Sequence, residues 1–297
     1  MSQATQRKIV EQHRGEITHE VHGTTAESMH ELGDNSVHLV VTSPPYWNIK
    51  DYGSDNQIGY QDSLADYLER LKAVWQECHR VLKPGCRMVV NIGDQYHRAT
   101  DGRPYQITPL NAHVINSVLD ATSRKMLFLG SIIWQKISNT DTSGGASVMG
   151  SYGRPRNGYV SYDYEYISIF RKPGDDPKVP QEIVDADEIT LEEWRELFAG
   201  HWNFTGKDQD NHPAPFPEEL PRRIMRMFSF SGDVVLDPFL GSGTTIKVAD
   251  EMNRSSVGYE IGFDSPSGDP WQEVVKQKIG YHDYEEPARS KRFNLNM

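Results

Sequence analysis

Short apolar runs alternate along the chain with segments in which apolar residues recur at helical spacing. Val37–Val41 and Arg87–Ile92 have the length expected for buried strands. Between them, Ser63 is followed three residues later by Asp66, which is a helix N-cap pattern, and apolar residues then recur at helical spacing as far as Leu82. This order predicts a strand–helix–strand unit, the building block of a parallel sheet.

The same alternation predicts further elements over the rest of the chain. Polar turns and proline or glycine residues separate them, and capping signals mark some helix starts. In chain order they are helix Pro104–Ala121, strand Leu127–Trp134, strand Tyr164–Phe170, helix Leu191–Phe198, helix Glu218–Phe228, strand Val234–Leu236, helix Thr244–Met252 and strand Ser256–Tyr259. We therefore predict an α/β protein with a mostly parallel central sheet flanked by helices.

Length and composition fit one soluble globular unit. The 297 residues suffice for one large α/β domain with insertions or for two small domains, and a content of 37% hydrophobic and 25% charged residues is ordinary for a soluble globular protein. No apolar stretch approaches the roughly 20 residues of a membrane span, and the polar N-terminus lacks a signal-peptide core. Cys78 and Cys86 lie in a helix pattern and a strand pattern, without metal-ligand spacing. We predict a cytoplasmic protein with no membrane association and no bound metal.

Whether this chain can bind nucleic acid depends more on where its charged residues lie than on its net charge. A formal net charge of −11 argues against nucleic acid as a partner. Acidic residues, however, crowd into Asp175–Glu196, whereas basic residues gather elsewhere. The basic clusters are Arg154/Arg156, Arg171/Lys172, Arg222/Arg223/Arg226 and Arg289/Lys291/Arg292. An acidic chain with such patches can still bind DNA, with marked salt sensitivity.

The most informative junction is Ser43–Tyr46, here called the ledge, which follows the apolar run Val37–Val41 directly. Pro44 and Pro45 fix the backbone and donate no hydrogen bonds, so the carbonyls around them stay available to a ligand. Tyr46 offers a flat face on which a base can stack, and Ser43 adds a hydroxyl. The segment suits a planar ring that carries an exposed amino group. A strand followed by a proline-rich turn is the simpler interpretation of the ledge alone.

A second motif, Asp237–Thr245, here called the glycine loop, follows a predicted strand and opens a predicted helix. Gly241 and Gly243 allow a tight turn and close approach to a ligand at the helix N-terminus. The loop lacks the Gly-Lys-Ser/Thr of a P-loop, which disfavours triphosphate binding. Glu260 ends the next strand, roughly 20 residues on, where an acid can hydrogen-bond two ribose hydroxyls. Together these features indicate a nucleotide-like cofactor.

The two motifs together, TSPPY at 42–46 and DPFLGSGTT at 237–245, resemble the amino-methylating DNA methyltransferases, which methylate exocyclic nitrogens with S-adenosylmethionine. The ledge precedes the glycine loop, as in the beta class of that family. Other segments agree: Gln57–Gly59, Arg80–Gly85, Asn91–Asp94, His212–Pro217 and Gly258–Glu260. The resemblance covers roughly residues 20–262. It implies a Rossmann-like S-adenosylmethionine-dependent methyltransferase fold with circularly permuted motif order.

The resemblance also implies catalytic roles for Ser43, Pro44, Pro45 and Tyr46. Ser43 and the Pro44 carbonyl would accept hydrogen bonds from the target amino group and direct its lone pair toward the methyl carbon. Tyr46 would stack on a base flipped out of the duplex. Transfer would be direct, without a covalent enzyme intermediate. Ring-carbon methylation needs a cysteine that follows a proline, whereas the two cysteines here follow Glu77 and Gly85.

The cofactor site implied by the resemblance lies at the glycine loop. Asp237, Pro238, Phe239, Gly241, Gly243 and Thr244 would line the methionine and adenosine region, with Glu260 on the ribose. Phe216 is either an apolar wall of this site or a packing residue. Many relatives carry an acidic residue near the start of the chain, where it meets the adenine ring, and here Thr24 is the candidate substitute. The expected product is S-adenosylhomocysteine, and no metal is implied.

We expect one methyltransferase domain over residues 1–297, with small inserts. The catalytic half spans about 17–137 and 163–171, the cofactor-binding half about 212–262, and the C-terminal tail about 263–297. A glycine-rich recognition loop, about 138–162, supplies Asn139, Arg154, Arg156 and Asn157 as DNA-binding candidates. The acidic insert, about 172–211, is a poor duplex partner.

Serine before Pro-Pro-Tyr is typical of cytosine-N4 enzymes, while aspartate or asparagine is typical of adenine-N6 enzymes. We therefore predict methylation of cytosine N4 in duplex DNA, with adenine N6 as the alternative. Enzymes that methylate RNA bases or protein glutamine usually carry the glycine motif before the ledge, and a catalytically silent DNA-binding paralogue would not need an intact site. A cognate restriction endonuclease as partner, and a monomer or a homodimer, are left open.

Overall fold

The computed structural model describes residues 8–14, 17–48, 51, 56–97, 99–100, 102, 104–136, 149–150, 155–160, 163–204 and 217–261. Within these ranges the chain forms a nine-stranded central sheet with helices on both faces. Two smaller two-stranded sheets lie outside it. No helix in the described ranges is long and apolar enough to cross a membrane.

The central sheet is mixed but mostly parallel. Its strands, in spatial order, are β1 (Lys8–Arg14), β2 (Ile17–His22), β13 (Ser255–Tyr259), β12 (Val234–Asp237), β3 (Val37–Thr42), β4 (Leu82–Ile92), β10 (Tyr164–Arg171), β7 (Leu127–Gln135) and β11 (His201–Asn203). β2, β13, β12, β3 and β4 pair in parallel, as do β7 and β11. β1 and β10 run antiparallel to their neighbours. The parallel strands β2, β13, β12, β3 and β4 therefore end at one edge of the sheet.

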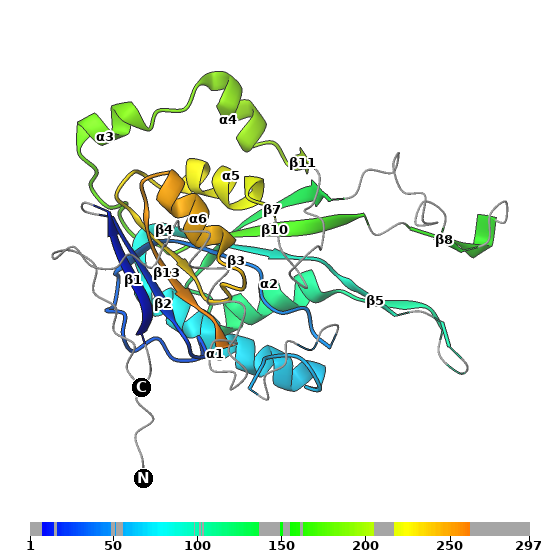
Figure 1. The fold of residues 1–297 in the computed structure, drawn as a ribbon. Helices are drawn as coiled ribbons and strands as arrows, with labels where there is room; N and C mark the ends of the chain where they lie inside the picture. Colours follow the sequence, from blue (N-terminus) through cyan, green and yellow to red (C-terminus); the bar gives the residue numbers. More distant parts are fainter. Residues whose placement is uncertain are drawn as a thin grey trace, which may run out of the picture.

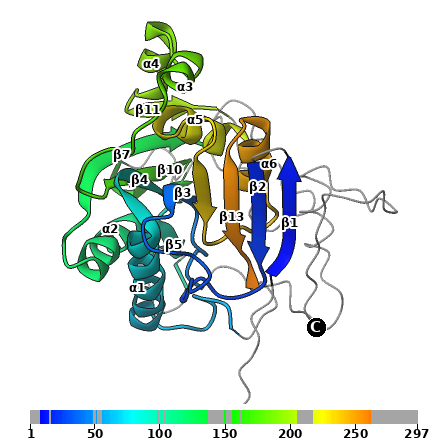
Figure 2. The same cartoon turned by 90° about the vertical axis from the view of Figure 1, so that its left-hand side faces the viewer.

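Two helical layers cover the sheet (Figure 2). One core combines the sheet with α1 (Leu64–Val81) and α2 (Leu110–Ala121), and a second core combines it with α5 (Glu219–Phe228) and α6 (Thr244–Glu251). α1 begins where the sequence predicts, because the Ser63 hydroxyl accepts a hydrogen bond from the Asp66 N–H at 3.2 Å.

Three smaller units extend from this body (Figure 1). The hairpin β5 (Gln95–His97) and β6 (Gln106–Thr108) follows β4, and the hairpin β8 (Met149–Gly150) and β9 (Gly158–Tyr159) follows β7. In Figure 1 both extend toward the same side of the molecule. The helices α3 (Gln181–Ala186) and α4 (Leu191–Leu197) form an arm elsewhere, beside α5.

Most elements predicted from the apolar pattern are present within a few residues of their predicted bounds. The prediction of a helix over Pro104–Ala121 is wrong for its first residues. β6 occupies Gln106–Thr108, and α2 begins only at Leu110. Pro109 explains the difference, because the residue before a proline is driven into extended backbone. The sequence patterns also missed β1, β2, α3 and β11, which are short or largely polar.

Candidate active site

The candidate residues converge because they follow strands that end at the same edge of the sheet. Ser43 follows β3, Gly241 follows β12, and Glu260 follows β13. Thr24 follows β2 at this edge and is half-buried. Ligand sites of open α/β sheets lie at this edge.

The ledge is held in place by the loop and helix beside it. Pro44 is buried, whereas Ser43 and Tyr46 are half-buried. The Tyr67 hydroxyl of α1 donates to the Pro45 carbonyl at 2.8 Å. The indole N–H of Trp47 donates to the Asp62 carbonyl at 2.9 Å. These contacts fix the backbone of the ledge, while Ser43 and Tyr46 stay partly accessible.

The glycine loop needs glycine for its backbone conformation. Gly241 has φ +53° and Gly243 has φ +78°, both in the left-handed region that other residues enter with strain. Gly243 is the N-cap of α6, and no side chain caps the helix there. Helix N-termini of this kind attract anionic and polar ligand groups.

A buried carboxylate joins the two motifs. Asp237 is 0% exposed and accepts hydrogen bonds from the Thr42 hydroxyl at 2.9 Å and the Thr245 hydroxyl at 2.6 Å. The N–H of Phe239 also donates to it, at 3.1 Å. Burial raises the pKa of Asp237 to about 6, against the opposing effect of these hydrogen bonds. Asp237 thus fixes the residue before the ledge to the start of α6, while its side chain is turned into the protein.

Glu260 supports the glycine loop from the neighbouring strand. Its carboxylate accepts a hydrogen bond from the Gly241 N–H at 2.7 Å, and it is half-buried. The N–H of Leu240 donates to the Tyr259 carbonyl at 2.9 Å, which ties the same loop to β13. The rings of His22 and Tyr259 stack on each other, with centroids 4.9 Å apart. Glu260 is therefore already oriented at the strand end where a ribose is expected.

The other residues of the predicted cofactor site lie in the glycine loop and differ in their exposure. Pro238, Gly243 and Thr244 are buried, and Phe239 is half-buried. The Phe239 ring meets Trp75 of α1 edge-on, with centroids 6.4 Å apart. Phe216 lies outside the described residues.

A polar cluster beside the ledge was not predicted. Glu165, at the start of β10, is 8% exposed, and its carboxylate accepts from the Asn91 side chain at 2.8 Å and from Lys136 at 2.7 Å. The Tyr46 hydroxyl faces this group, and burial together with the Glu165 charge raises the pKa of Tyr46 well above its ordinary value. A sequence signal existed, because Glu165 occupies the same strand phase as the buried Ile167.

Two of the predicted DNA-binding residues, Arg156 and Asn157, lie between the two strands of the hairpin β8–β9. Arg156 lies on the short 3-10 helix η1 (Pro155–Asn157) and is exposed, and Asn157 ends that helix. Tyr159 of β9 stacks on Tyr105, with ring centroids 4.3 Å apart, which links this hairpin to the segment before β6. Asn139 and Arg154 lie outside the described residues.

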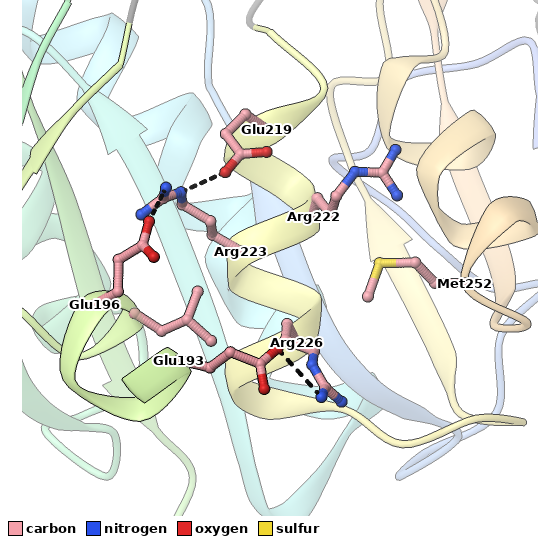
Figure 3. A pocket seen from close by; sticks show the side chains of 8 residues that line it. Glu193, Glu196, Glu219, Arg222, Arg223, Arg226 and Met252 are labelled. Carbon is pink, nitrogen blue, oxygen red and sulfur yellow. Dashed lines mark hydrogen bonds and ion pairs between the residues drawn. The ribbon is translucent and has the colours of Figure 1, made fainter. Parts of the chain in front are cut away.

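A pocket of about 310 Å³ lies elsewhere, between α4, α5 and the end of α6 (Figure 3). All three of its arginines are in ion pairs: Arg222 contacts Glu251, Arg223 contacts Glu219 at 2.6 Å and Glu196 at 2.5 Å, and Arg226 contacts Glu193 at 3.4 Å. None of the predicted site residues lines it. We therefore place the candidate active site at the ledge and the glycine loop and not at this pocket.

Neither cysteine is suited to nucleophilic catalysis. Both are free and buried. Burial raises the pKa of the Cys86 thiol to about 11 and raises the pKa of Cys78 further. A thiol of this kind carries little reactive thiolate at neutral pH. Among the described residues, no group of three His, Cys, Asp or Glu side chains could hold a metal ion.

The mostly parallel sheet, with the ledge and the glycine loop side by side at its carboxyl edge, defines a methyltransferase fold of the S-adenosylmethionine-dependent kind. Comparison with known proteins then gives the family. The chain belongs to the N6/N4 methyltransferase family of DNA methylases, whose model matches residues 37–263. The predicted fold class and family are thereby confirmed.

Two relatives and one solved structure match over most of their lengths. The chain is 37% identical over 289 residues to the type II methyltransferase M.MjaI of Methanocaldococcus jannaschii, covering 86% of this chain and 89% of that protein. It is 36% identical over 273 residues to the type II methyltransferase M.MthZI of Methanothermobacter thermautotrophicus, covering 82% and 73%. The crystal structure of a DNA modification methylase from Thermus thermophilus, complexed with S-adenosyl-L-methionine, superposes with a TM-score of 0.69 at 31% identity, covering 88% of this chain and 93% of that one.

Proposed function

We propose that this protein is a type II DNA methyltransferase that transfers a methyl group from S-adenosylmethionine to the exocyclic N4 of a cytosine flipped out of duplex DNA. The observation that carries the proposal is the Asp237 bridge. Its hydrogen bonds to Thr42 and Thr245 hold the ledge and the glycine loop against each other. A base on the ledge and a cofactor at the loop would then lie within reach of each other.

The glycine loop fits S-adenosylmethionine. Backbone in the left-handed region at Gly241 and Gly243 opens the N-terminus of α6, and Glu260 stands at the end of the next strand. We assign Gly241, Gly243 and Thr244 to the methionine and adenosine region and Glu260 to the ribose hydroxyls. Phe239, Pro238 and Asp237 support this loop, and we assign Thr24 to the adenine end. The type II relatives and the S-adenosylmethionine complex of the Thermus protein support the choice of cofactor.

The cofactor supplies an electrophilic methyl group on a sulfonium centre. The Ser43 hydroxyl and the Pro44 carbonyl would accept hydrogen bonds from the target amino group, so that its nitrogen lone pair points at that methyl carbon. The new N–C bond would form as the S–C bond breaks, so that S-adenosylhomocysteine is the leaving group and the amino nitrogen would lose one proton to solvent. Tyr46 would hold the base by stacking on its face. The high pKa of the Cys78 and Cys86 thiols supports direct transfer without a covalent enzyme intermediate.

The choice of cytosine N4 rests on Ser43. The hydroxyl is neutral, and this position is typically serine in cytosine-N4 enzymes and aspartate or asparagine in adenine-N6 enzymes. Adenine N6 is the second candidate on the same fold.

The two hairpins that extend from the carboxyl edge are our candidates for the DNA-contacting elements. Arg156 is exposed on one of them, and the Tyr105–Tyr159 stack joins the two. The arm α3–α4 carries most of the acidic insert, and like charge would hold it away from the phosphates. A cognate restriction endonuclease is proposed as a partner only by analogy with the type II relatives.

The substrate class can be tested with radiolabelled S-adenosylmethionine and an equal mass of unmethylated duplex DNA, total RNA or unfolded protein. We expect label in the DNA alone, and label confined to RNA or protein would overturn the proposal.

A further inference from the structure

Arg70 of α1 contacts two segments that come from different strands of the candidate active site. One segment is Thr25–Glu27, which directly follows Thr24 at the end of β2, and the other is Asn56–Asp62, which lies between the ledge and α1. In the sheet, β2 is separated from β3, the strand that carries the ledge, by β13 and β12. The arginine therefore joins two parts of the site that the sheet itself holds apart.

The Arg70 guanidinium binds the carboxylate of Glu27 through two hydrogen bonds. Nε donates to one oxygen at 3.0 Å, and Nη2 donates to the other at 3.0 Å. The Thr25 hydroxyl also donates to the Glu27 carboxylate, at 2.8 Å, and accepts from the Glu27 N–H at 3.3 Å. A two-point contact between planar groups fixes their relative orientation, so the segment after β2 is held to α1 in one position.

The terminal nitrogens of Arg70 also hold the second segment. Nη1 donates to the Gln57 carbonyl at 2.8 Å, and Nη2 donates to the Asn56 carbonyl at 2.8 Å. Nη1 lies 3.6 Å from the Asp62 carboxylate as well. Gln57 is 5% exposed, and the backbone carbonyl of a buried residue needs a hydrogen-bond partner. The position of this segment therefore depends on the same guanidinium.

The segment Asn56–Asp62 in turn contacts the residues that follow the ledge. The indole N–H of Trp47 donates to the Asp62 carbonyl at 2.9 Å, and the N–H of Asn48 donates to the Gly59 carbonyl at 3.2 Å. The Asp62 carboxylate accepts from the Gly59 N–H at 2.8 Å, which fixes the shape of the segment. The arginine of α1 is thereby connected to the ledge as well as to the end of β2.

We propose that Arg70 is a positioning residue that couples binding of the cofactor to binding of the target base. The proposed function assigns the adenine end of S-adenosylmethionine to Thr24 and the base to the ledge, and the inference rests on both assignments. A cofactor that holds the end of β2 in place also holds, through Arg70, the segment Asn56–Asp62 and the ledge. Each ligand then raises the affinity of the protein for the other.

The coupling is measured as the ratio of two dissociation constants of S-adenosylhomocysteine, obtained by calorimetric titration without and with saturating duplex DNA. The DNA is an unmethylated amplified fragment that the wild type is found to methylate. We expect a ratio of about five or more for the wild type. We expect a ratio of about one for Arg70→Gln, and also for Arg70→Lys, since an ammonium group cannot bind a carboxylate and two carbonyls in the geometry of a guanidinium.

Arg80→Gln is the matched control on the same helix. Arg80 binds the carboxylate of Glu77 through two hydrogen bonds, at 2.9 and 2.7 Å, and donates to the carbonyls of Met29 and Leu32 at 2.8 Å. Among the described residues, its side-chain partners lie on α1 and after β2, and none is in Asn56–Asp62. Arg80→Gln should therefore lose a comparable set of contacts and keep the wild-type ratio.

A ratio near one in the wild type, or an unchanged ratio in Arg70→Gln, would overturn the inference. An equal loss in Arg80→Gln would overturn it too, because the effect would then be a general loss of stability. If Arg70→Gln does not fold, Glu27→Ala decides, since it breaks the connection at its other end: a ratio of about one supports the inference and a wild-type ratio contradicts it.

The proposed function and the role of Arg70 fail in different ways. A wild type that transfers no methyl group to DNA contradicts the proposed function. A wild type that methylates DNA with a ratio near one contradicts only the role of Arg70.

Discussion

At the scale of the residue, the proposed mechanism depends on Ser43. A hydroxyl that accepts from the amino group acts mainly in the transition state, when the nitrogen acquires positive charge. Ser43→Ala should therefore lose at least about a hundredfold in kcat while its affinity for S-adenosylmethionine stays within about twofold of the wild type. Single-turnover kinetics and calorimetric titration of the cofactor measure the two quantities. If Ser43→Ala were as active as the wild type, Ser43 would have no part in the mechanism.

The buried carboxyl group of Asp237 should make the free energy of unfolding depend on pH. Burial raises its pKa from 3.8 to about 6, so the folded state binds a proton more tightly than the unfolded state. The stability that this proton contributes is present below about pH 4 and is lost as the pH rises through about 6, which is a fall of about 3 kcal/mol. Urea unfolding at a series of pH values should show this component in the wild type and not in Asp237→Asn. Parallel pH profiles for the two proteins would contradict it.

The residues of the site differ in how far the sequence could predict them. The positions of Ser43, Tyr46, Gly241 and Glu260 at one edge of the sheet were predictable, because each stands directly after an apolar run or within a glycine turn. The position of Glu165 beside the ledge was not predictable, since it depends on the pairing of β10 with β4, which brings residues far apart in the chain together. The inward-facing position of the Asp237 side chain likewise depends on contacts with Thr42 and Thr245.

At the scale of the element, close packing behind the glycine loop should be sensitive to a single methyl group. A Cβ atom at Gly258 of β13 would lie 2.6 Å from Leu240 Cδ2, and Leu240 is buried in the glycine loop. Gly258→Ala should lower the free energy of unfolding by about 1–3 kcal/mol and weaken cofactor binding, because Leu240 must move. Chemical denaturation and calorimetric titration measure these effects.

Gly200→Ala is the control for this prediction, since a Cβ atom there meets nothing within 4 Å. A Gly258→Ala variant as stable as Gly200→Ala, with wild-type cofactor affinity, would show that the loop tolerates displacement.

The elements themselves were largely predictable from the apolar pattern. Long amphipathic segments such as α1, with Ser63 as its cap, follow from local signals. Short polar strands do not: β11 is recognisable mainly through its pairing with β7, and the start of α2 was displaced by Pro109. The order of strands in the sheet is likewise a property of the tertiary contacts.

At the scale of the whole molecule, an acidic protein is proposed to bind an acidic polymer. Binding must then depend on local basic groups and on salt. Arg156→Gln should reduce the slope of log affinity against log salt by about 1 and leave cofactor affinity unchanged. Fluorescence anisotropy with a labelled duplex at several salt concentrations measures the slope.

Arg195→Gln, on α4 of the acidic arm, is the matched control and should leave the slope unchanged. A slope that shifts equally in both variants would mean that net charge, and not the hairpin β8–β9, governs the contact.

Transfer to an exocyclic cytosine nitrogen is tested by the identity of the methylated nucleoside. Unmethylated genomic DNA is incubated with the wild type or with Ser43→Ala and S-adenosylmethionine carrying a deuterated methyl group, then digested to nucleosides for mass spectrometry. We expect deuterated N4-methylcytosine from the wild type and almost none from the variant. Deuterated N6-methyladenine alone would contradict the assignment of the base, and 5-methylcytosine would contradict the mechanism.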